Sequence, residues 1–302
     1  MSGSVLFTFR VRGYYAKHPI VDNVVDQKLG VVMTRTCVAV LGFGEAGTAI
    51  SADLVAAGAV VRGYDPVARV TPGVVDCAAE AEAVLGADVV LSLNSADDAM
   101  IALRNGCRAL GPGAVWADLN TGGAVLKREL AAALVRPSTS TLFADVALMS
   151  PVPGRGVRTP MLVSGEGAAR YAELMIPLGA QVDVLEGPPG EAATRKLLRS
   201  VFFKGLAAAV VEALTAARAV GLEEWLRENI ADELTRSGPE TVERLERGSV
   251  QHAVRRAHEM AAATELLRDL GVSSRIAAAS RDLLLELAGC SSVEAKLPAE
   301  DS

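Results

Sequence analysis

Residues 42–47 read GFGEAG, a glycine pattern whose backbone can bind the pyrophosphate of a dinucleotide. In this chemistry Gly42 permits a tight turn, Gly44 lets the backbone approach the phosphates, and Gly47 allows a helix to pack closely on a strand. A helix that begins here adds free N–H groups and a partial positive charge for the phosphates. The predicted cofactor site includes all six residues of the pattern: Gly42, Phe43, Gly44, Glu45, Ala46 and Gly47.

Asp65 follows the glycine pattern at the end of a second apolar run. A carboxylate at this point can accept hydrogen bonds from the hydroxyls of an adenosine ribose and repels a 2′-phosphate, which favours NAD over NADP. Arg62 and Arg69 weaken this preference, because an arginine near the ribose can bind a 2′-phosphate. Asp65 can also be a simple turn residue before Pro66. The predicted cofactor is therefore NAD or NADP, with NAD slightly favoured.

Hydride transfer to or from a nicotinamide also needs a group that moves a proton. Lys196 is the best candidate, because it lies in the first turns of a long predicted helix and shares a face with Ser200. A partly desolvated lysine near other cations can lose its proton near neutral pH, and Arg195 and Arg199 are such cations. On residue chemistry alone, a solvated surface lysine is the slightly favoured interpretation, since helix lysines are usually exposed.

The elements that must position these residues alternate from residue 37 onward. Short apolar runs, typical of buried parallel strands, are separated by segments with helical periodicity. Strands are predicted at 37–41, 59–64, 74–76, 87–93, 114–119, 142–148, 160–164 and 181–185, and helices at 46–57, 78–85, 96–110, 124–134 and 171–176. This alternation predicts a parallel sheet covered on both faces, and it places GFGEAG between a strand and a helix, as a dinucleotide site requires.

The pattern changes at the Gly-Pro-Pro-Gly segment 187–190, beyond which only helical periodicity is found. Helices are predicted at 191–220, 223–236, 250–270 and 275–287. The expected fold is a Rossmann-type α/β domain with a parallel sheet, followed by an all-α domain. The predicted domains are an N-terminal extension over 1–34, the NAD(P)-binding domain over 35–188, a helical substrate and dimerisation domain over 189–292, and a tail over 293–302.

The N-terminal extension has no period long enough to place a helix or strand. Its apolar run at 5–9 is too short for the core of a signal peptide. Two interpretations stay open. The native chain starts at Met33, or the segment is an arm that is disordered unless it packs against the rest.

Three predicted strands end in small polar residues or glycine, at the edge where such sheets bind ligands. Ordinary turn chemistry explains these residues equally well, because Asn120 or Thr121 can cap the helix that follows. We expect Asn94 and Ser95 beside the cofactor, and Asn120, Thr121, Gly122 and Ser150 beside the substrate.

Composition excludes several classes of protein. The chain of 302 residues is 50% hydrophobic, which is too apolar for a disordered chain, yet no stretch reaches the ~18 apolar residues of a membrane span. A net charge of −6 argues against a nucleic-acid partner. The four cysteines are scattered and only three histidines are present, so we expect no metal site. We expect a cytoplasmic protein whose thiols are reduced.

The order of GFGEAG, Tyr64-Asp65, LSLN at 91–94, DLNTGG at 118–123 and a helix bearing Lys196 resembles the β-hydroxyacid dehydrogenase superfamily. This superfamily includes 3-hydroxyisobutyrate and 6-phosphogluconate dehydrogenases, and the match covers roughly residues 37–290. The segment 196–205 is similar to a phosphogluconate-dehydrogenase-like branch whose helical C-terminal domain is uncharacterised. The resemblance implies that Lys196 is the general acid/base, that residues 120–122 replace the substrate-binding Ser-Thr segment, and that the helical domains form a homodimer.

Differences from the family's sequence pattern reduce the number of possible activities. Ser200 stands where well-known members carry asparagine, and Met149-Ser150-Pro151 stands where they carry Ser-Gly-Gly. Phe203 stands where the 6-phosphogluconate enzyme has a proton-donating glutamate, which argues against decarboxylation of that substrate. Imine reductases share the architecture but usually replace the lysine by Asp or Tyr.

These observations predict an NAD(P)-dependent oxidoreductase that moves a hydride between nicotinamide and a small hydroxy acid or its oxo acid. Its partner is a small anionic molecule, bound by Asn120, Thr121, Gly122, Ser150, Arg199 and Ser200. Two alternatives stay open: C=N reduction as in imine reductases, and a nicotinamide-binding sensor without turnover.

Overall fold

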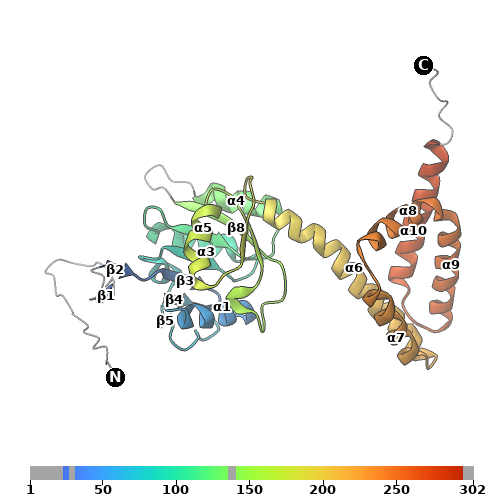
Figure 1. Ribbon diagram of the computed structural model, residues 1–302, viewed down its shortest axis with the longest axis horizontal. Helices are drawn as coiled ribbons and strands as arrows, with labels where there is room; N and C mark the ends of the chain where they lie inside the picture. The colour runs from blue at the N-terminus through green and yellow to red at the C-terminus, as the bar shows by residue number, and fades with distance from the viewer. Residues whose placement is uncertain (1–22, 27–30, 135–140, 295–302) are drawn as a thin grey trace, which may run out of the picture. The chain divides into compact units, whose positions relative to one another are not determined.

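The computed structural model describes residues 23–26, 31–134 and 141–294 (Figure 1). The chain divides into two compact units, Met1–Leu198 and Arg199–Ser302. This division falls inside helix α6 (Glu191–Ala219), whereas the sequence pattern changes just before that helix.

All eight predicted strands are present in one sheet of the first unit, in the order β10-β9-β8-β7-β6-β3-β4-β5. The strands nearest the glycine pattern are β3 (Cys37–Leu41) at the centre, β4 (Val60–Tyr64) and β5 (Val75–Asp76) on one side, and β6 (Val89–Ser92) and β7 (Val115–Asp118) on the other. The far edge is formed by β8 (Leu142–Leu148), β9 (Met161–Ser164) and β10 (Val182–Val184). The strand order reverses between β3 and β6, which is where open α/β sheets bind ligands.

The predicted parallel sheet is found, with one antiparallel pair at this far edge. β8 and β9 pair antiparallel, while β9 and β10 are again parallel to each other. The described link from β8 to β9 contains the short 3-10 turn η2 (Gly156–Arg158) and no crossover helix. Because a parallel pair needs a crossover that carries the chain back across the sheet, this link lets the chain reverse direction instead.

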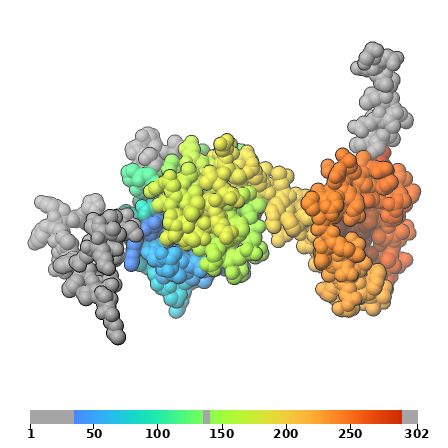
Figure 2. Space-filling model, viewed as in Figure 1, coloured from blue at the N-terminus to red at the C-terminus, as the bar shows by residue number. Residues whose placement is uncertain are grey.

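Two apolar clusters hold helices on opposite faces of the sheet. Along β3, Val38 and Val40 belong to one cluster, and Ala39 and Leu41 belong to the other, as the alternation of a strand requires. The first cluster contains residues of α1 (Glu45–Ala56) and α5 (Ala168–Met175), and the second contains residues of α2 (Glu80–Val84), α3 (Ala99–Gly106) and α4 (Ala124–Leu134). Short 3-10 turns, η1 (Cys107–Ala109) and η3 (Ile176–Leu178), extend α3 and α5. In Figure 2 much of the visible face of this unit is formed by the segment from β8 to the start of α6, coloured green to yellow.

The N-terminal extension contains two short strands that the sequence pattern does not predict. β1 (Asn23–Asp26) and β2 (Val31–Thr34) pair antiparallel. Four residues each are too few to establish a period in the sequence. The rest of the extension before residue 31 and the predicted tail from residue 295 lie outside the described residues.

The second unit is helical, and its helices are α7 (Glu223–Thr235), α8 (Pro239–Gln251), α9 (Ala253–Asp269) and α10 (Arg275–Glu294), together with the later turns of α6. Helix α8 is absent from the sequence prediction. It contains only three large apolar residues, Val242, Leu245 and Val250, which are too few to establish a period. The usable signal is Gly238 at the N-cap followed by Pro239 in the first turn, which is a typical helix start. In the described part of the chain, no helix is long and apolar enough to cross a membrane.

Candidate nicotinamide and substrate site

The glycine turn between β3 and α1 has two glycines that the protein itself requires. Gly42 has a φ of +105°, and a Cβ there would lie 2.5 Å from the carbonyl oxygen of Leu93. A Cβ on Gly47 would lie 1.9 Å from the carbonyl oxygen of Gly42. Any side chain at either position therefore collides with the main chain.

Gly44 has a different reason to be glycine. A Cβ on Gly44 would meet no heavy atom within 4 Å, and its φ of −66° suits any residue. Gly44 is the N-cap of α1, and among the described residues no side chain caps the helix there. An open glycine beside uncapped N–H groups is suited to a phosphate group that approaches the backbone. The turn therefore fits a dinucleotide.

Asp65 ties the end of β4 to this turn. Its Oδ2 accepts a hydrogen bond from the N–H of Phe43 at 2.7 Å, and its Oδ1 accepts from the N–H groups of Val67 and Ala68 at 2.8 and 2.7 Å. Burial acts to raise the pKa of the Asp65 carboxyl, but these three backbone donors outweigh it and hold the pKa below its usual range. The turn therefore carries a fixed negative charge where the ribose of a dinucleotide is expected.

The two arginines near Asp65 are placed differently. The Arg62 guanidinium donates to the carbonyl oxygen of Glu82 at 2.6 Å, so it is anchored to α2. Arg69 is exposed in the loop after β4. Of the two, Arg69 is the better candidate for a 2′-phosphate.

The ends of β6 and β7 are joined by one amide group. Nδ2 of Asn120 lies 2.7 Å from Oδ1 of Asn94, 3.1 Å from Oγ of Ser92 and 2.6 Å from Oδ1 of Asp118. Asn120 is buried. Its amide nitrogen therefore fixes the two strand ends, as turn chemistry would, and the structure brings Asn94 and Asn120 together at the predicted edge.

Ser95 is engaged in a local turn. Its hydroxyl donates to Oδ2 of Asp98 at 2.7 Å and accepts from the N–H of Asp98 at 3.1 Å, just before α3 begins. Ser150 is half-buried in the loop after β8, with its hydroxyl 3.5 Å from the carbonyl oxygen of Pro151. The roles of both residues toward cofactor or substrate stay predictions.

Lys196 and Thr121 come from distant parts of the sequence and meet at one hydrogen bond. The Lys196 ammonium donates to Oγ1 of Thr121 at 2.8 Å. Burial, aided by the positive charge of Lys127, lowers the pKa of Lys196, and the negative charge of Asp145 opposes this shift. A half-buried lysine with a lowered pKa differs from the solvated surface lysine of the alternative interpretation.

Two further predicted substrate residues, Arg199 and Ser200, follow on α6 and open the second unit. The Arg199 guanidinium lies 4.1 Å above the ring of Phe203, a cation–π contact that holds it along the helix.

Three charged residues of the site are not identified from the sequence as functional candidates. Lys127 of α4, Asp118 of β7 and Asp145 of β8 are all buried and form a single ionic cluster. The signal was available: Asp145 interrupts the apolar run of a buried strand, and Lys127 occupies the same helix face as Leu130 and Leu134. Because charged side chains at buried positions are normally paired, Asp145 and Lys127 together predict an internal ion pair.

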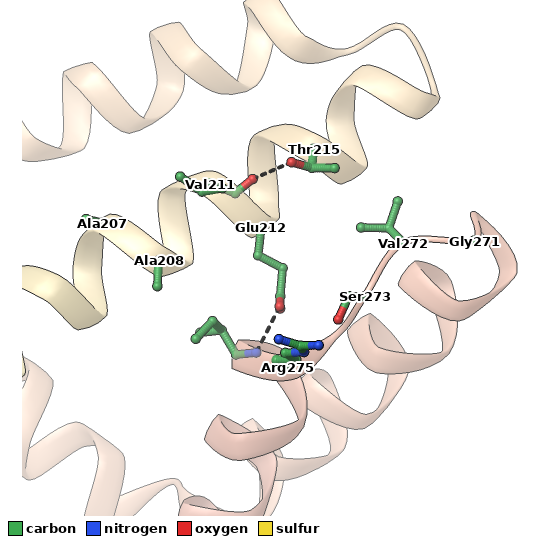
Figure 3. A pocket seen from close by; sticks show the side chains of 10 residues that line it. Ala207, Ala208, Val211, Glu212, Thr215, Gly271, Val272, Ser273 and Arg275 are labelled. Atoms are coloured by element: carbon green, nitrogen blue, oxygen red, sulfur yellow. Dashed lines mark hydrogen bonds between the residues drawn. The ribbon is translucent and has the colours of Figure 1, made fainter.

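The second unit contains a separate pocket between α6 and the start of α10 (Figure 3). The carboxylate of Glu212 lies in it and accepts hydrogen bonds from the N–H groups of Ile276 and Ala277 at 2.9 and 2.8 Å, so it caps α10. Small side chains, Ala207 and Ala208, line the α6 wall. Among the described residues, no group of three or more His, Cys, Asp or Glu side chains is arranged to hold a metal ion.

Comparison with known proteins agrees with this architecture. Residues 217–287 match the family described as a domain of unknown function, DUF1932. No curated protein sequence matches the chain. A conserved hypothetical protein from Sinorhizobium meliloti 1021 is 27% identical, with 83% of this chain and 88% of that chain covered and a TM-score of 0.53.

Two further solved structures relate the fold to oxidoreductases. A conserved protein of unknown function, described as structurally similar to 3-hydroxyacid dehydrogenases, is 26% identical over 83% of this chain and 96% of that chain, with a TM-score of 0.53. A reductive aminase from Aspergillus terreus, solved with NADPH and ethyl levulinate, is 17% identical over 84% of this chain and 93% of that chain, with a TM-score of 0.70. The chain thus has the fold of the β-hydroxyacid dehydrogenase superfamily, with a DUF1932 domain in its helical unit, as the sequence resemblance predicts.

Proposed function

We propose that this protein is an NAD(P)-dependent oxidoreductase that interconverts a small hydroxy acid and its oxo acid. The observation that carries the proposal is the hydrogen bond between Lys196 and Thr121, at the ligand-binding edge of a sheet that also carries an open glycine turn. A bound nicotinamide dinucleotide would accept or supply the hydride. The residues of the chain must bind both ligands and move the proton.

The glycine turn and the first N–H groups of α1 would bind the pyrophosphate, and Asp65 would bind the adenosine ribose. A carboxylate held ionised by three backbone donors favours NAD, because it repels a 2′-phosphate. The reductive aminase with a similar fold is described with NADPH, and exposed Arg69 is a candidate for its 2′-phosphate, so both cofactors must be titrated.

Lys196 would act as the general acid/base. In oxidation its neutral amine takes the proton from the substrate hydroxyl, and in reduction its ammonium gives a proton to the carbonyl oxygen. The lowered pKa supports this role, because a larger fraction of the amine is neutral near physiological pH than for an ordinary lysine. Thr121 and Gly122 would contact the substrate beside Lys196, and Ser150, Arg199 and Ser200 would contribute to binding its anionic group.

The same proposal excludes oxidative decarboxylation of 6-phosphogluconate, because Phe203 offers no proton where that chemistry needs an acid. A second candidate reaction is reduction of a C=N bond. Similarity in fold to imine reductases favours it, although a lysine at position 196 does not match their usual Asp or Tyr.

The protein would act as a homodimer assembled through its helical unit. Exposed apolar side chains support this arrangement: Val201 is 75% exposed, and Phe202 and Val211 are 57% and 66% exposed. A helix with this much uncovered apolar surface is typical of an interface. The cytoplasmic location stays a prediction from the cysteine pattern.

A substrate screen tests the function. Purified protein is assayed with hydroxy acids, sugar acids and cyclic imines, with NAD(H) and NADP(H), by nicotinamide absorbance. We expect turnover with a hydroxy acid that is lost in Lys196→Met and kept in Lys204→Met, the other described lysine of α6, which is exposed. Turnover with imines alone would select the second candidate. Nicotinamide binding without any turnover would indicate a sensor.

A further inference from the structure

A buried ionic bridge lies next to the Lys196–Thr121 pair. The ammonium of Lys127 is 2.6 Å from Oδ2 of Asp118 and 3.3 Å from Oδ1 of Asp145. Lys127 is 1% exposed, and both carboxylates are fully buried. Such clusters are poor sources of stability, because desolvation of the charges offsets their attraction. A cluster of one lysine with two carboxylates therefore calls for another role.

One end of the bridge fixes the loop that carries Thr121. Besides the carboxylate of Asp118, the Lys127 ammonium donates to the main-chain carbonyl oxygens of Asp118 and Asn120, both at 2.9 Å. The second carboxylate oxygen of Asp118 accepts from the amide of Asn120. The main chain on the N-terminal side of Thr121 is thus held from α4.

The other end of the bridge fixes the first turn of α6. Oδ2 of Asp145 accepts hydrogen bonds from the N–H groups of Gly190 and Ala193 at 2.9 and 3.1 Å, and from the hydroxyl of Ser164 at 3.2 Å. A carboxylate at a helix N-terminus satisfies its unpaired donors and interacts favourably with its dipole. Lys196 lies one turn further along this helix.

We propose that Lys127, Asp118 and Asp145 are positioning residues that hold Lys196 against Thr121, by linking the substrate loop to the first turn of α6. This inference rests on the proposed function, in which Lys196 transfers the proton. Both ends of the Lys196–Thr121 hydrogen bond are anchored to the same three side chains. Loss of the bridge therefore separates the general acid/base from the substrate loop.

The bridge also sets the charge around Lys196. Lys127 on α4 faces it with a positive charge that lowers its pKa, and Asp145 on β8 faces it with a negative charge that raises its pKa. Asp118 on β7 is paired with Lys127. On its own helix the charged neighbours are Glu191, Arg195 and Arg199. Removal of the Lys127 charge should raise the pKa of Lys196, and removal of the Asp145 charge should lower it.

Two variants separate loss of position from loss of charge, because release of Lys196 from Thr121 raises its pKa in both, whereas the lost charges act in opposite directions. The reactivity of Lys196 toward acetic anhydride is measured against pH by mass spectrometry, in the full-length protein without substrate. The variants are Lys127→Met and Asp145→Asn. Matched controls are Arg128→Met, at the exposed next position of α4, and Asp183→Asn, exposed on β10.

We expect the midpoint for Lys196 to move upward by about one pH unit in Lys127→Met, where release of Lys196 and loss of the positive charge act in the same direction. In Asp145→Asn the two effects oppose each other, so the midpoint should move less, and the controls should not change. Turnover should fall at least tenfold in both variants while nicotinamide affinity stays within twofold. Asp145→Asn keeps the size and an acceptor oxygen, so it carries the test if Lys127→Met does not fold. Turnover within twofold of the wild type in Asp145→Asn, or an unchanged midpoint in a folded Lys127→Met, overturns the positioning role.

The Lys196 midpoint tests the positioning role independently of the proposed function. If the midpoints move as expected but Lys196→Met keeps full turnover, Lys196 is held as we infer and the proposed reaction mechanism is wrong. If Lys196→Met is inactive but the midpoints do not move, the mechanism stands and the bridge is only structural.

Discussion

The ammonium nitrogen of Lys196 lies 2.8 Å from the hydroxyl oxygen of Thr121, although the two residues are 75 positions apart in the chain. Thr121 follows the end of β7, and Lys196 lies in the second turn of α6. The contact brings the amine of Lys196 to the edge of the sheet where the glycine turn also lies. Chemistry at this edge would therefore have both a cofactor site and an acid/base.

Replacement of Lys196 should separate chemistry from cofactor binding. Lys196→Met keeps the length of the side chain but cannot transfer a proton, so kcat should fall about 10²–10⁴-fold. Thr121→Val removes the hydroxyl that accepts from the ammonium and that is proposed to contact the substrate, so kcat should fall about ten- to a hundredfold. Steady-state kinetics on the substrate found by screening and fluorescence titration of the reduced nicotinamide measure the two properties. Loss of cofactor affinity in step with kcat would contradict the assignment.

The pH dependence of the reaction should follow the same side chain. In the proposed mechanism the neutral amine is the base, so kcat/KM for oxidation should rise with pH through the pKa of Lys196, and kcat/KM for reduction should fall over the same range. Burial lowers this pKa, so the midpoint should lie below the value of about 10.4 for an ordinary lysine. A pH profile with no inflection below that value would argue against Lys196 as the base.

The glycines of the turn should behave differently on substitution. Gly44→Ala meets no atom of the protein and has an ordinary φ, so the melting temperature should not fall, yet nucleotide affinity should drop at least tenfold. Gly47→Ala forces a Cβ against the carbonyl of Gly42 and should destabilise the fold by about 1–3 kcal/mol. Calorimetry and nucleotide titration separate these effects.

Gly111→Ala is the matched control for this pair, because its Cβ also meets open space and it lies away from the turn. It should change neither property. If Gly44→Ala bound nucleotide as well as the wild type, the space beside Gly44 would have no part in binding.

The sequence predicted the sheet well because buried parallel strands appear as short apolar runs, such as 37–41 and 142–148, which match β3 and β8. The direction of each strand was harder to predict than its position. The runs that form β9 and β10 look like the others, and only the link from β8 decides that they reverse. Helix α8 was missed because it holds only three large apolar residues, Val242, Leu245 and Val250, too few to establish a helical period by hydrophobicity alone.

The site was predicted in the same uneven way. Strand ends are visible in the sequence, so the positions of Asn120 and Thr121 could be predicted. The amide of Asn120, however, is engaged by Asn94 and Asp118, and pairing of side chains across strands leaves no local pattern. The bridge through Lys127 joins three elements and depends on their packing.

Asp65 should control both acid stability and cofactor choice. Its folded-state pKa is lowered, so its contribution to stability is present above the unfolded pKa and is lost as pH falls through the folded value. Asp65→Asn removes this pH dependence, so the melting temperature of the wild type should fall more steeply in acid than that of the variant. The variant should also bind NADP better relative to NAD, because the charge that repels the 2′-phosphate is gone.

Thermal melts from pH 7 to pH 3 and paired titrations with both nucleotides check this prediction. Asp76→Asn, an exposed carboxylate on β5, is the control and should match the wild type in both. An unchanged ratio of NAD to NADP affinity in Asp65→Asn would remove Asp65 from the ribose site.

The exposed apolar face of α6 should hold two chains together. Val201→Asp places a charge at a position that is 75% exposed in the single chain, so it should leave the fold intact but oppose burial against a partner. Light scattering after size exclusion should give twice the 31.4 kDa of one chain for the wild type and a single chain for the variant at micromolar concentration. Ile101→Asp, on an exposed position of α3, is the matched control and should remain a dimer. A wild type that is a monomer at all concentrations, or a Val201→Asp variant that stays dimeric, would show that this face does not form the interface.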